Sequence, residues 1–394
     1  MDEKLIYIAN IKLPTERAHG IQITKMCEAF AATGVETRLL ISRRSNNIKT
    51  DIFIYYGLKV YFRIIVLPTP DLIWLGRFGF WSQNLIFSAL SFFYCLIHSD
   101  FDLVYSRDEL PLYFLSFLNK KIVWEMHSDR FNFLIKGLTK RILAIVAISA
   151  GLKQFLGNNM VKLNRVLVSP DAVDISLFEC LPSDKNVLRK SLNLPLEKSL
   201  ITYVGKYMTM NKDKGVDALI EAFFLVRHKF PNSRLLLVGI YETEVAKLKN
   251  FINQIGLSIE DCIIVTHRPH EEAMKYVKAG DVLIMNYPNL WHYALYMSPL
   301  KLFEYMASGN VIVSTSLPSI REVLSLKEAY LIKPADVAAL ADSIYYALTH
   351  PAESAQKAKS AYALVRQYTW ENRAKSILRF IHNQKLIQEN EKNN

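Results

Sequence analysis

One stretch of the sequence combines a predicted helix start with charged side chains at regular spacing, YMSPLKLFEYMASGN at residues 296–310. Ser298 and the proline after it predict the N-cap and first position of a helix, and Gly309 predicts its end. Lys301 would then lie in the first turn, where a cation is unfavourable unless an anion binds there. Ser298, Lys301 and Glu304 would share one face, which predicts a phosphate at the helix start and a sugar one turn deeper. The alternative is a solvated face with incidental charges.

A second stretch, YVGKYMTMNKDKGVDALIEAF at residues 203–223, places lysines on a loop between a strand and a helix. Gly205 ends the predicted strand and allows a close approach to a ligand. Lys206, Lys212 and Lys214 could clamp a diphosphate, and the alternative is a solvated charged loop. The sequence has no GxGxxG and no Walker pattern, which argues against nicotinamide enzymes and P-loop ATPases.

In the first half of the chain, three residues stand where predicted elements begin or end. Gly20, in RAHGIQ at the predicted start of the first helix, would allow close approach of a backbone or a phosphate. Arg107 and His127 each end a predicted strand, and such ends face the ligand in parallel sheets. A structural role is the alternative for each of these two side chains.

Short apolar runs alternate with helical segments along the whole chain. The runs are 5–10, 36–42, 101–107, 121–127, 144–149 and 166–170, then 199–205, 234–239, 262–266, 281–286 and 311–315. Buried strands alternating with helices predict an α/β fold with two doubly wound parallel sheets. We predict an N-terminal domain at 1–180, a second domain at 181–366, and a C-terminal helix at 367–394 that packs back on the first.

Composition limits the class of protein. The chain of 394 residues has a net charge of +11 that is spread evenly, and it lacks nucleic-acid-binding motifs. We therefore expect its anionic partner to be a membrane surface or a phosphate-bearing substrate and not a nucleic acid. Four dispersed cysteines without a C-x-x-C pair suggest neither zinc nor disulfides. The start of the chain does not resemble a signal peptide, and we expect a cytoplasmic protein. Residues 78–97 carry no charge; we interpret them as a buried helix, with a membrane-dipping helix as the alternative.

Taken together and in this order, these segments resemble family 4 of the glycosyltransferases, which has the GT-B fold of two Rossmann-like domains facing each other across a cleft. The resemblance covers nearly the whole chain and rests on RAHGIQITKMCEAFA, VWEMH, AIVAISAGL, SPDAVDISLF, VGK…KGVDALIEAF, SPLKLFEYMASGNVIVST and YTWENRAKSIL. It implies transfer of a hexose-like sugar from a UDP- or GDP-sugar, without metal or cofactor and with retention of configuration. The implied acceptor is a glycan or a lipid-linked glycan of bacterial-type polysaccharide synthesis, at the inner face of the plasma membrane.

The resemblance also implies residue roles. Lys206 and Lys214 match the basic pair that neutralises the donor diphosphate, and Glu304 matches the glutamate that holds the ribose hydroxyls. The loop ending at Leu300 and Lys301 matches backbone amides that lie on the diphosphate.

Three further positions also match. Gly20 matches a glycine loop facing the donor, His127 a histidine near the reacting sugar, and Arg268 a loop that reaches the base. Two positions depart from the pattern: Tyr296 stands where a first glutamate is usual, and a long loop lets Lys212 replace Lys214. The departure at Tyr296 leaves open an inactive nucleotide-sugar-binding scaffold; an epimerase on the same fold is the other alternative.

Overall fold

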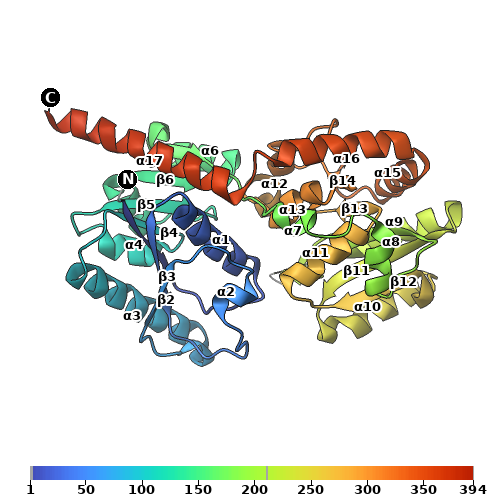
Figure 1. Cartoon of the computed structure of the whole chain (residues 1–394), viewed down its shortest axis with the longest axis horizontal. Helices are drawn as coiled ribbons and strands as arrows, with labels where there is room; N and C mark the ends of the chain where they lie inside the picture. Colours follow the sequence, from blue (N-terminus) through green and yellow to red (C-terminus); the bar gives the residue numbers. More distant parts are fainter. Residues whose placement is uncertain (1–2, 210–211, 394) are drawn as a thin grey trace. The chain divides into compact units, whose positions relative to one another are not determined.

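The computed structural model describes residues 3–209 and 212–393, with no side chain described for residues 209, 212, 213, 392 and 393. The chain divides into two compact units (Figure 1). Unit 1 runs to Asp171 and takes up the chain again from Trp370, and unit 2 comprises Ala172–Thr369.

Unit 1 is built on a seven-stranded parallel sheet of order β3-β2-β1-β4-β5-β6-β7. The strands are β1 (Lys4–Ala9), β2 (Glu36–Ser42), β3 (Arg63–Leu67), β4 (Leu103–Ser106), β5 (Lys121–Met126), β6 (Ala144–Ala147) and β7 (Val166–Val168). The helices are α1 (Ala18–Ala32), α2 (Ile52–Tyr55), α3 (Gly76–Ile97), α4 (Glu109–Leu115), α5 (Phe133–Arg141), α6 (Ala150–Asn158) and α17 (Trp370–Asn393). The central strands are buried, as near-continuous apolar runs in a parallel sheet require.

Unit 2 is built on a six-stranded parallel sheet of order β12-β11-β8-β13-β14-β15. The strands are β8 (Ser199–Val204), β11 (Ser233–Ile240), β12 (Cys262–Thr266), β13 (Val282–Met285), β14 (Val311–Thr315) and β15 (Tyr330–Ile332), with a separate antiparallel pair, β9 (Met208–Thr209) and β10 (Lys212–Asp213). The helices are α7 (Ser176–Glu179), α8 (Lys185–Ser191), α9 (Val216–Lys229), α10 (Glu242–Gln254), α11 (His270–Ala279), α12 (Trp291–Leu295), α13 (Leu300–Ser308), α14 (Pro318–Arg321), α15 (Val337–Thr349) and α16 (Pro351–Val365).

Two doubly wound parallel sheets confirm the predicted α/β fold class. The predicted boundary at 180 falls inside unit 2, because Val173 forms a parallel bridge with Thr369 and Phe178 is buried in the core of unit 2. The last helix begins at Trp370, three residues after the predicted segment at 367–394 starts. In unit 1 it packs against α1, where the two helices lie side by side in Figure 1.

The interpretation of residues 78–97 as a buried helix is wrong. These residues form most of α3, but its buried residues are few: Gly79, Gln83, Phe87, Ser88, Ser91 and Cys95. Large apolar side chains such as Phe78 and Trp81 are exposed instead. The small and polar residues face the unit because they let α3 approach its neighbours closely.

Each sheet has one point where the strand order reverses. In unit 1 it lies between β1 and β4, and in unit 2 between β8 and β13. Ligands of doubly wound sheets bind beyond the carboxyl ends of the strands at these points. The residues that follow these strands are therefore the first place to look for a functional site.

Candidate functional site

The carboxyl end of β8 is shaped by a glycine and two tyrosines. Gly205 follows the strand with a φ of +148°, which side chains rarely adopt, and a Cβ there would lie 2.8 Å from the Nζ atom of Lys301. Glycine thus leaves room for that lysine. The backbone N–H of Val204 donates to the hydroxyl of Tyr305 at 2.9 Å, and the Tyr203 hydroxyl donates to the Lys206 carbonyl at 2.9 Å. The first bond fixes the strand end against α13, and the second closes the turn after the strand.

The ammonium group of Lys301 is buried at this strand end. Within the described part of the chain its Nζ atom has no hydrogen-bond partner, and it lies 3.7 Å from the centre of the Tyr203 ring and 5.7 Å from that of Tyr287. Burial, followed by the charge of Lys214, holds the pKa of Lys301 well below its ordinary value. A buried cation without acceptors is costly, and a bound anion would supply them. Lys301 is the second residue of α13, where backbone N–H groups also favour an anion.

Two further lysines come from the loop between β8 and α9. Burial, and then the charge of Lys206, lowers the pKa of Lys214 to about 8. Lys206 places its Nζ atom 4.9 Å from the centre of the Tyr241 ring. The backbone of Lys212 lies in β10, and its side chain is outside the described residues. Lys206, Lys214 and Lys301 therefore gather at one end of the sheet.

Gly215 closes the same loop. Its φ is +85°, and a Cβ there would overlap the carbonyl oxygen of Asn286, the residue after β13. The Asn286 side chain donates to the Gly215 carbonyl at 3.1 Å. The loop with the lysines is thus held against the neighbouring strand at the point where the strand order reverses.

Helix α13 carries the predicted acidic residue one turn beyond Lys301. An oxygen of the Glu304 carboxylate lies 2.7 Å from the Nε2 atom of His270, at the start of α11. The N-cap prediction for Ser298 is wrong: α13 begins at Leu300, and Pro299 takes the cap position without a side-chain bond. Ser298 therefore lies before the helix, and does not share its face with Lys301 and Glu304.

The remaining predicted site residues of unit 2 are Arg268 and Tyr296, and each contacts a neighbouring side chain. Arg268 forms an ion pair with Glu272, its Nε atom 3.2 Å from the carboxylate, and both side chains are partly exposed. Tyr296, at the position where a glutamate was expected, is only 4% exposed and contacts the Trp291 ring. A buried tyrosine there offers no carboxylate to a sugar.

Unit 1 holds a buried cluster at the end of β5. Glu125 is fully buried, and its carboxylate binds His127 Nε2 at 2.5 Å and Arg373 Nη1 at 3.2 Å. It also accepts hydrogen bonds from the Tyr105 hydroxyl and, at 2.6 Å, from the Gln22 amide. Arg373 comes from α17 and donates as well to the carbonyls of Ser169 and Pro170. The C-terminal helix thus completes the cluster.

The cluster sets the charge of its members. Burial alone would raise the pKa of Glu125, but the Arg373 guanidinium and the His127 hydrogen bond hold it below its ordinary value. Burial, and then the charge of Arg107, lowers the pKa of His127 to about 4, so its imidazole is neutral at pH 7. With Nε2 bound to Glu125, the Nδ1 atom is the ring nitrogen suited to accept a hydrogen bond.

The structure places the other predicted residues of unit 1 as follows. Arg107 follows β4 and donates to the Gln22 amide oxygen at 2.8 Å, which links it to the Glu125 cluster. Gly20 is the third residue of α1 rather than part of a loop before it. A Cβ at Gly20 would clash with the hydroxyl of Tyr56, which bonds to the backbone of Thr15. Close packing therefore explains this glycine without a ligand.

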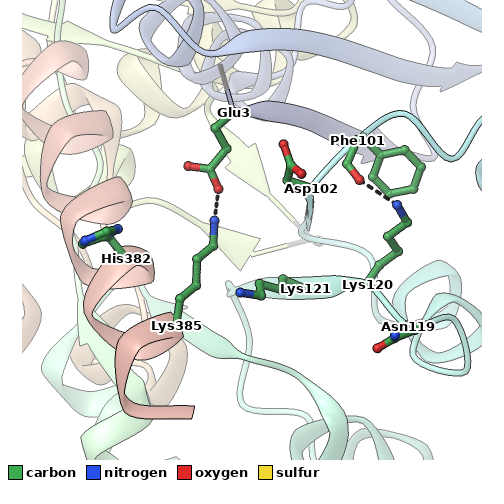
Figure 2. Close-up of a pocket in the computed structure, with 8 residues that line it drawn as sticks. All are labelled: Glu3, Phe101, Asp102, Asn119, Lys120, Lys121, His382 and Lys385. Carbon is green, nitrogen blue, oxygen red and sulfur yellow. Dashed lines mark hydrogen bonds and ion pairs between the residues drawn. The ribbon is translucent and has the colours of Figure 1, made fainter. Parts of the chain in front are cut away.

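A cavity of about 500 Å³ lies at the opposite end of the unit 1 sheet, next to the amino ends of β1, β4 and β5 (Figure 2). Its lysines already have partners: Lys385 pairs with Glu3, and Lys120 donates to the carbonyls of Ser99 and Phe101. Being at the amino ends of the strands, it is not where a doubly wound sheet binds its ligand.

Comparison with known proteins gives a family match within unit 2 and similarities that extend beyond it. Residues 198–350, within unit 2, match the family model described as Glycosyl transferases group 1. The capsular polysaccharide biosynthesis glycosyltransferase CapM of Staphylococcus aureus is 26% identical over 209 residues, which is 51% of this chain and 50% of that protein. The phosphatidyl-myo-inositol mannosyltransferase of Mycobacterium tuberculosis is 23% identical over 305 residues, 72% of this chain and 74% of that protein.

Solved structures agree over almost the whole chain. Sucrose-phosphate synthase from Thermosynechococcus elongatus superposes with a TM-score of 0.78 at 19% identity, covering 98% of this chain and 100% of that one. HepE from Anabaena in complex with UDP superposes with a TM-score of 0.74 at 15% identity, covering 97% and 100%. At these identities the likeness establishes the fold. The chain thus has the GT-B fold, and its residues 198–350 match the group 1 glycosyl transferases, the family that its sequence motifs predicted.

Proposed function

We propose that this protein transfers a sugar from a nucleoside diphosphate sugar to a glycan or lipid-linked acceptor, with retention of anomeric configuration. The observation that carries the proposal is the buried ammonium of Lys301, which lies against Gly205 at the end of β8. A diphosphate at this position would accept hydrogen bonds from Lys301 and from the free N–H groups of α13.

The rate of transfer would depend on how well the leaving diphosphate is stabilised. When the bond between the sugar C1 and the β-phosphate oxygen breaks, both electrons stay on the phosphate, and its charge grows. Lys206, Lys214 and Lys301 are positioned to stabilise that charge before it develops, which costs no reorganisation during the reaction. These three cations supply the charge that a metal ion provides in other transferases, so we expect a reaction without metal.

Other residues of unit 2 would hold the nucleoside. We assign the ribose hydroxyls to the Glu304 carboxylate, which would release His270 or share it when the donor binds. Arg268, at the end of the loop before α11, is assigned to the base. UDP is the first nucleotide to test, because HepE, which shares the fold, was solved with it.

In unit 1, we assign His127 to the sugar, as the family resemblance implies. His127 is held neutral and oriented through Nε2, so its Nδ1 atom can accept a hydrogen bond from a sugar hydroxyl. Glu125 and Arg373 act through this histidine and are positioning residues. The acceptor class follows the two relatives, one named for capsular polysaccharide and one for a phosphatidylinositol acceptor. We place the reaction at the cytoplasmic face of the plasma membrane.

A binding protein without transfer activity is the second candidate, because Tyr296 replaces an acidic residue and is buried. The two candidates differ in one measurement. A transferase consumes its donor when an acceptor is present, and also hydrolyses it slowly without one, whereas a scaffold only binds it. An epimerase would instead return a changed nucleotide sugar with the diphosphate intact.

The proposal is tested first by nucleotide-dependent stability. UDP, GDP and ADP are each added to the purified chain, and the melting temperature is followed. A nucleotide at 100 times its dissociation constant stabilises the folded state by about 2.7 kcal/mol. The base that raises the melting temperature most then guides the choice of sugar donor for the turnover assay. Failure of all three to shift it, in the presence or absence of Mg²⁺, would contradict the proposal.

A further inference from the structure

Helix α3 exposes large apolar side chains and buries mostly small and polar ones, which is the reverse of an ordinary surface helix. The face toward unit 1 is made largely of small and polar side chains, at Gly79, Gln83, Ser88 and Ser91. The hydroxyls of both serines donate to carbonyls of the same helix, at 2.7 and 2.8 Å, so they need no partner outside it. Phe87 and Cys95 are the apolar residues among the buried positions of α3, so the inward face buries less apolar surface than the outward face exposes.

The outward face carries the large apolar side chains. Six large apolar residues on this face of α3 are at least 52% exposed: Phe78, Trp81, Leu85, Phe93, Leu96 and Ile97. Trp74, just before the helix, is 78% exposed. Figure 1 shows α3 along the outer edge of unit 1. An apolar stripe of this size on a helix face marks a surface that meets something other than water.

The segment that leads into α3 is basic. Residues 43–77 include Arg43, Arg44, Lys49, Lys59, Arg63 and Arg77 but only Asp51 and Asp71 as acids, and five of the six cations are exposed. Tyr61 and Ile54 in this segment are also exposed. β3, which contains Arg63, packs against α3. Exposed cations beside exposed aromatic side chains complement an anionic interface with an apolar interior, which is a lipid surface.

The topology indicates how α3 meets that surface. At 22 residues the helix is about 33 Å long, long enough to cross a bilayer core. However, it connects β3 to β4, two strands of one parallel sheet, and packs along the unit against α4. A spanning helix would have to leave that contact and separate the two strands across the membrane. The connection therefore favours a helix that lies flat.

We propose that the outward face of α3, together with the basic segment 43–77, docks unit 1 on an anionic lipid surface with α3 in the plane of the headgroups. This face belongs to unit 1, whereas the lysines at the end of β8 belong to unit 2. Lipid binding and nucleotide binding can therefore be measured separately, and failure of one leaves the other standing.

The test is flotation of the purified full chain with vesicles. One set is phosphatidylcholine alone, and in the other part of it is replaced by phosphatidylglycerol. We expect flotation with the anionic vesicles that declines as salt rises, because salt screens exposed charges. Blue-shifted tryptophan fluorescence should accompany it, since Trp74 and Trp81 lie on the docking face.

Three variants separate the contributions. Phe78→Gln with Trp81→Gln should weaken partition into anionic vesicles at least about tenfold, because each removes apolar area that the lipid would cover. Lys59→Gln with Arg63→Gln and Arg77→Gln should weaken it about fivefold per charge. The matched control, Leu225→Gln with Leu326→Gln, removes two exposed leucines from unit 2 and should change nothing. A circular dichroism spectrum and a thermal unfolding midpoint equal to those of the wild type show that each variant is folded.

Three results would overturn the proposal. The first is no flotation of the wild type, or equal flotation of wild type and the Phe78/Trp81 variant. The second is flotation that resists alkaline carbonate, which would mean that α3 inserts across the bilayer. The third is a dimer in sedimentation velocity that the Phe78/Trp81 variant loses while neither protein floats, which would assign the face to a second copy of the chain.

Discussion

The Nζ atom of Lys301 lies 3.7 Å from the centre of the Tyr203 ring, buried and without a hydrogen-bond partner in the described part of the chain. The ring face offers a partial electrostatic substitute for the acceptors that the ammonium lacks. The site is therefore built around a cation whose full set of partners is absent until an anion binds.

This arrangement predicts that Lys301→Met stabilises the free protein. Methionine has a similar length and no charge to bury, so the free energy of unfolding of unit 2 should rise, by roughly 1–3 kcal/mol. Urea unfolding followed by circular dichroism measures it. Lys249→Met, at an exposed position on α10, is the control and should change the stability little. A clear loss of stability in Lys301→Met would show that the lysine has a structural partner.

Lys214 predicts a pH dependence of nucleotide binding. Its pKa of about 8 in the free protein should rise when a diphosphate binds, because the anion favours the ammonium form. Binding at pH 8 should therefore take up protons, and affinity should fall as the pH rises above about 8. Calorimetry in two buffers of different ionisation enthalpy measures the uptake. In Lys214→Arg, which stays charged, the uptake should shrink; equal uptake in both proteins would exclude Lys214 as its source.

The same shift has a consequence for the free protein. The folded pKa of Lys214 is lowered from 10.5 to about 8, so the unfolded chain holds the proton more tightly. The free-energy cost of burying the charged ammonium of Lys214 is complete below pH 8, and it is relieved as the pH rises toward 10.5. The contribution of Lys214 to the free energy of unfolding should therefore increase over this range, and Lys214→Met should lose that increase. A wild-type pH profile that this substitution leaves unchanged would contradict the shift.

Glu304 should matter for the nucleoside and not for the phosphates. Glu304→Ala should weaken UDP or GDP binding by about 1–3 kcal/mol, because two ribose hydroxyls would lose their acceptor. Binding of inorganic pyrophosphate should stay the same. Glu221→Ala, at an exposed position on α9, is the control for loss of one carboxylate. Equal weakening of UDP and pyrophosphate would mean that Glu304 acts on the diphosphate through Lys301.

Among the contacts of α17, the ion pair of Arg373 with Glu125 should contribute most to the stability of unit 1. Arg373→Met leaves the Glu125 carboxylate buried beside no guanidinium from α17, and should cost about 3–5 kcal/mol of stability. The double variant with Glu125→Gln should recover part of this loss, because a neutral amide needs no counter-charge. Lys375→Met, which breaks the exposed pair with Glu371, should cost no more than about 1 kcal/mol. Additive losses in the double variant would show that the two residues are not coupled.

The sequence predicted most strands of both sheets, some to the residue. β12 and β14 have the predicted bounds, because each is a short apolar run between clear helical segments. β3 was missed: it is an edge strand with exposed Arg63 and Val66, and so lacks the buried pattern. β15 has only three residues, too few for a periodicity.

The parts of the site formed by residues close together in the sequence could be predicted, whereas contacts between residues far apart in the sequence could not. Lys301 was detectable because a cation in a first helical turn conflicts with the helix dipole. The pairing of Glu125 with Arg373 was missed because 248 residues separate them. A charged residue inside the run VWEM was a signal that some buried partner exists, but the sequence does not say which. The prediction that α3 is buried was wrong because composition alone does not show which face of a helix points toward the protein.

The central claim is that the carboxyl end of β8 binds a nucleoside diphosphate through Lys301. Calorimetric titration of the wild type, Lys301→Met and the Lys249→Met control with the nucleotide that most raises the melting temperature tests it directly. We predict at least about tenfold weaker binding in Lys301→Met, since one charge-assisted hydrogen bond to a phosphate is worth about 1.5–3 kcal/mol, and no change in the control. Binding of equal affinity in all three proteins would contradict the account.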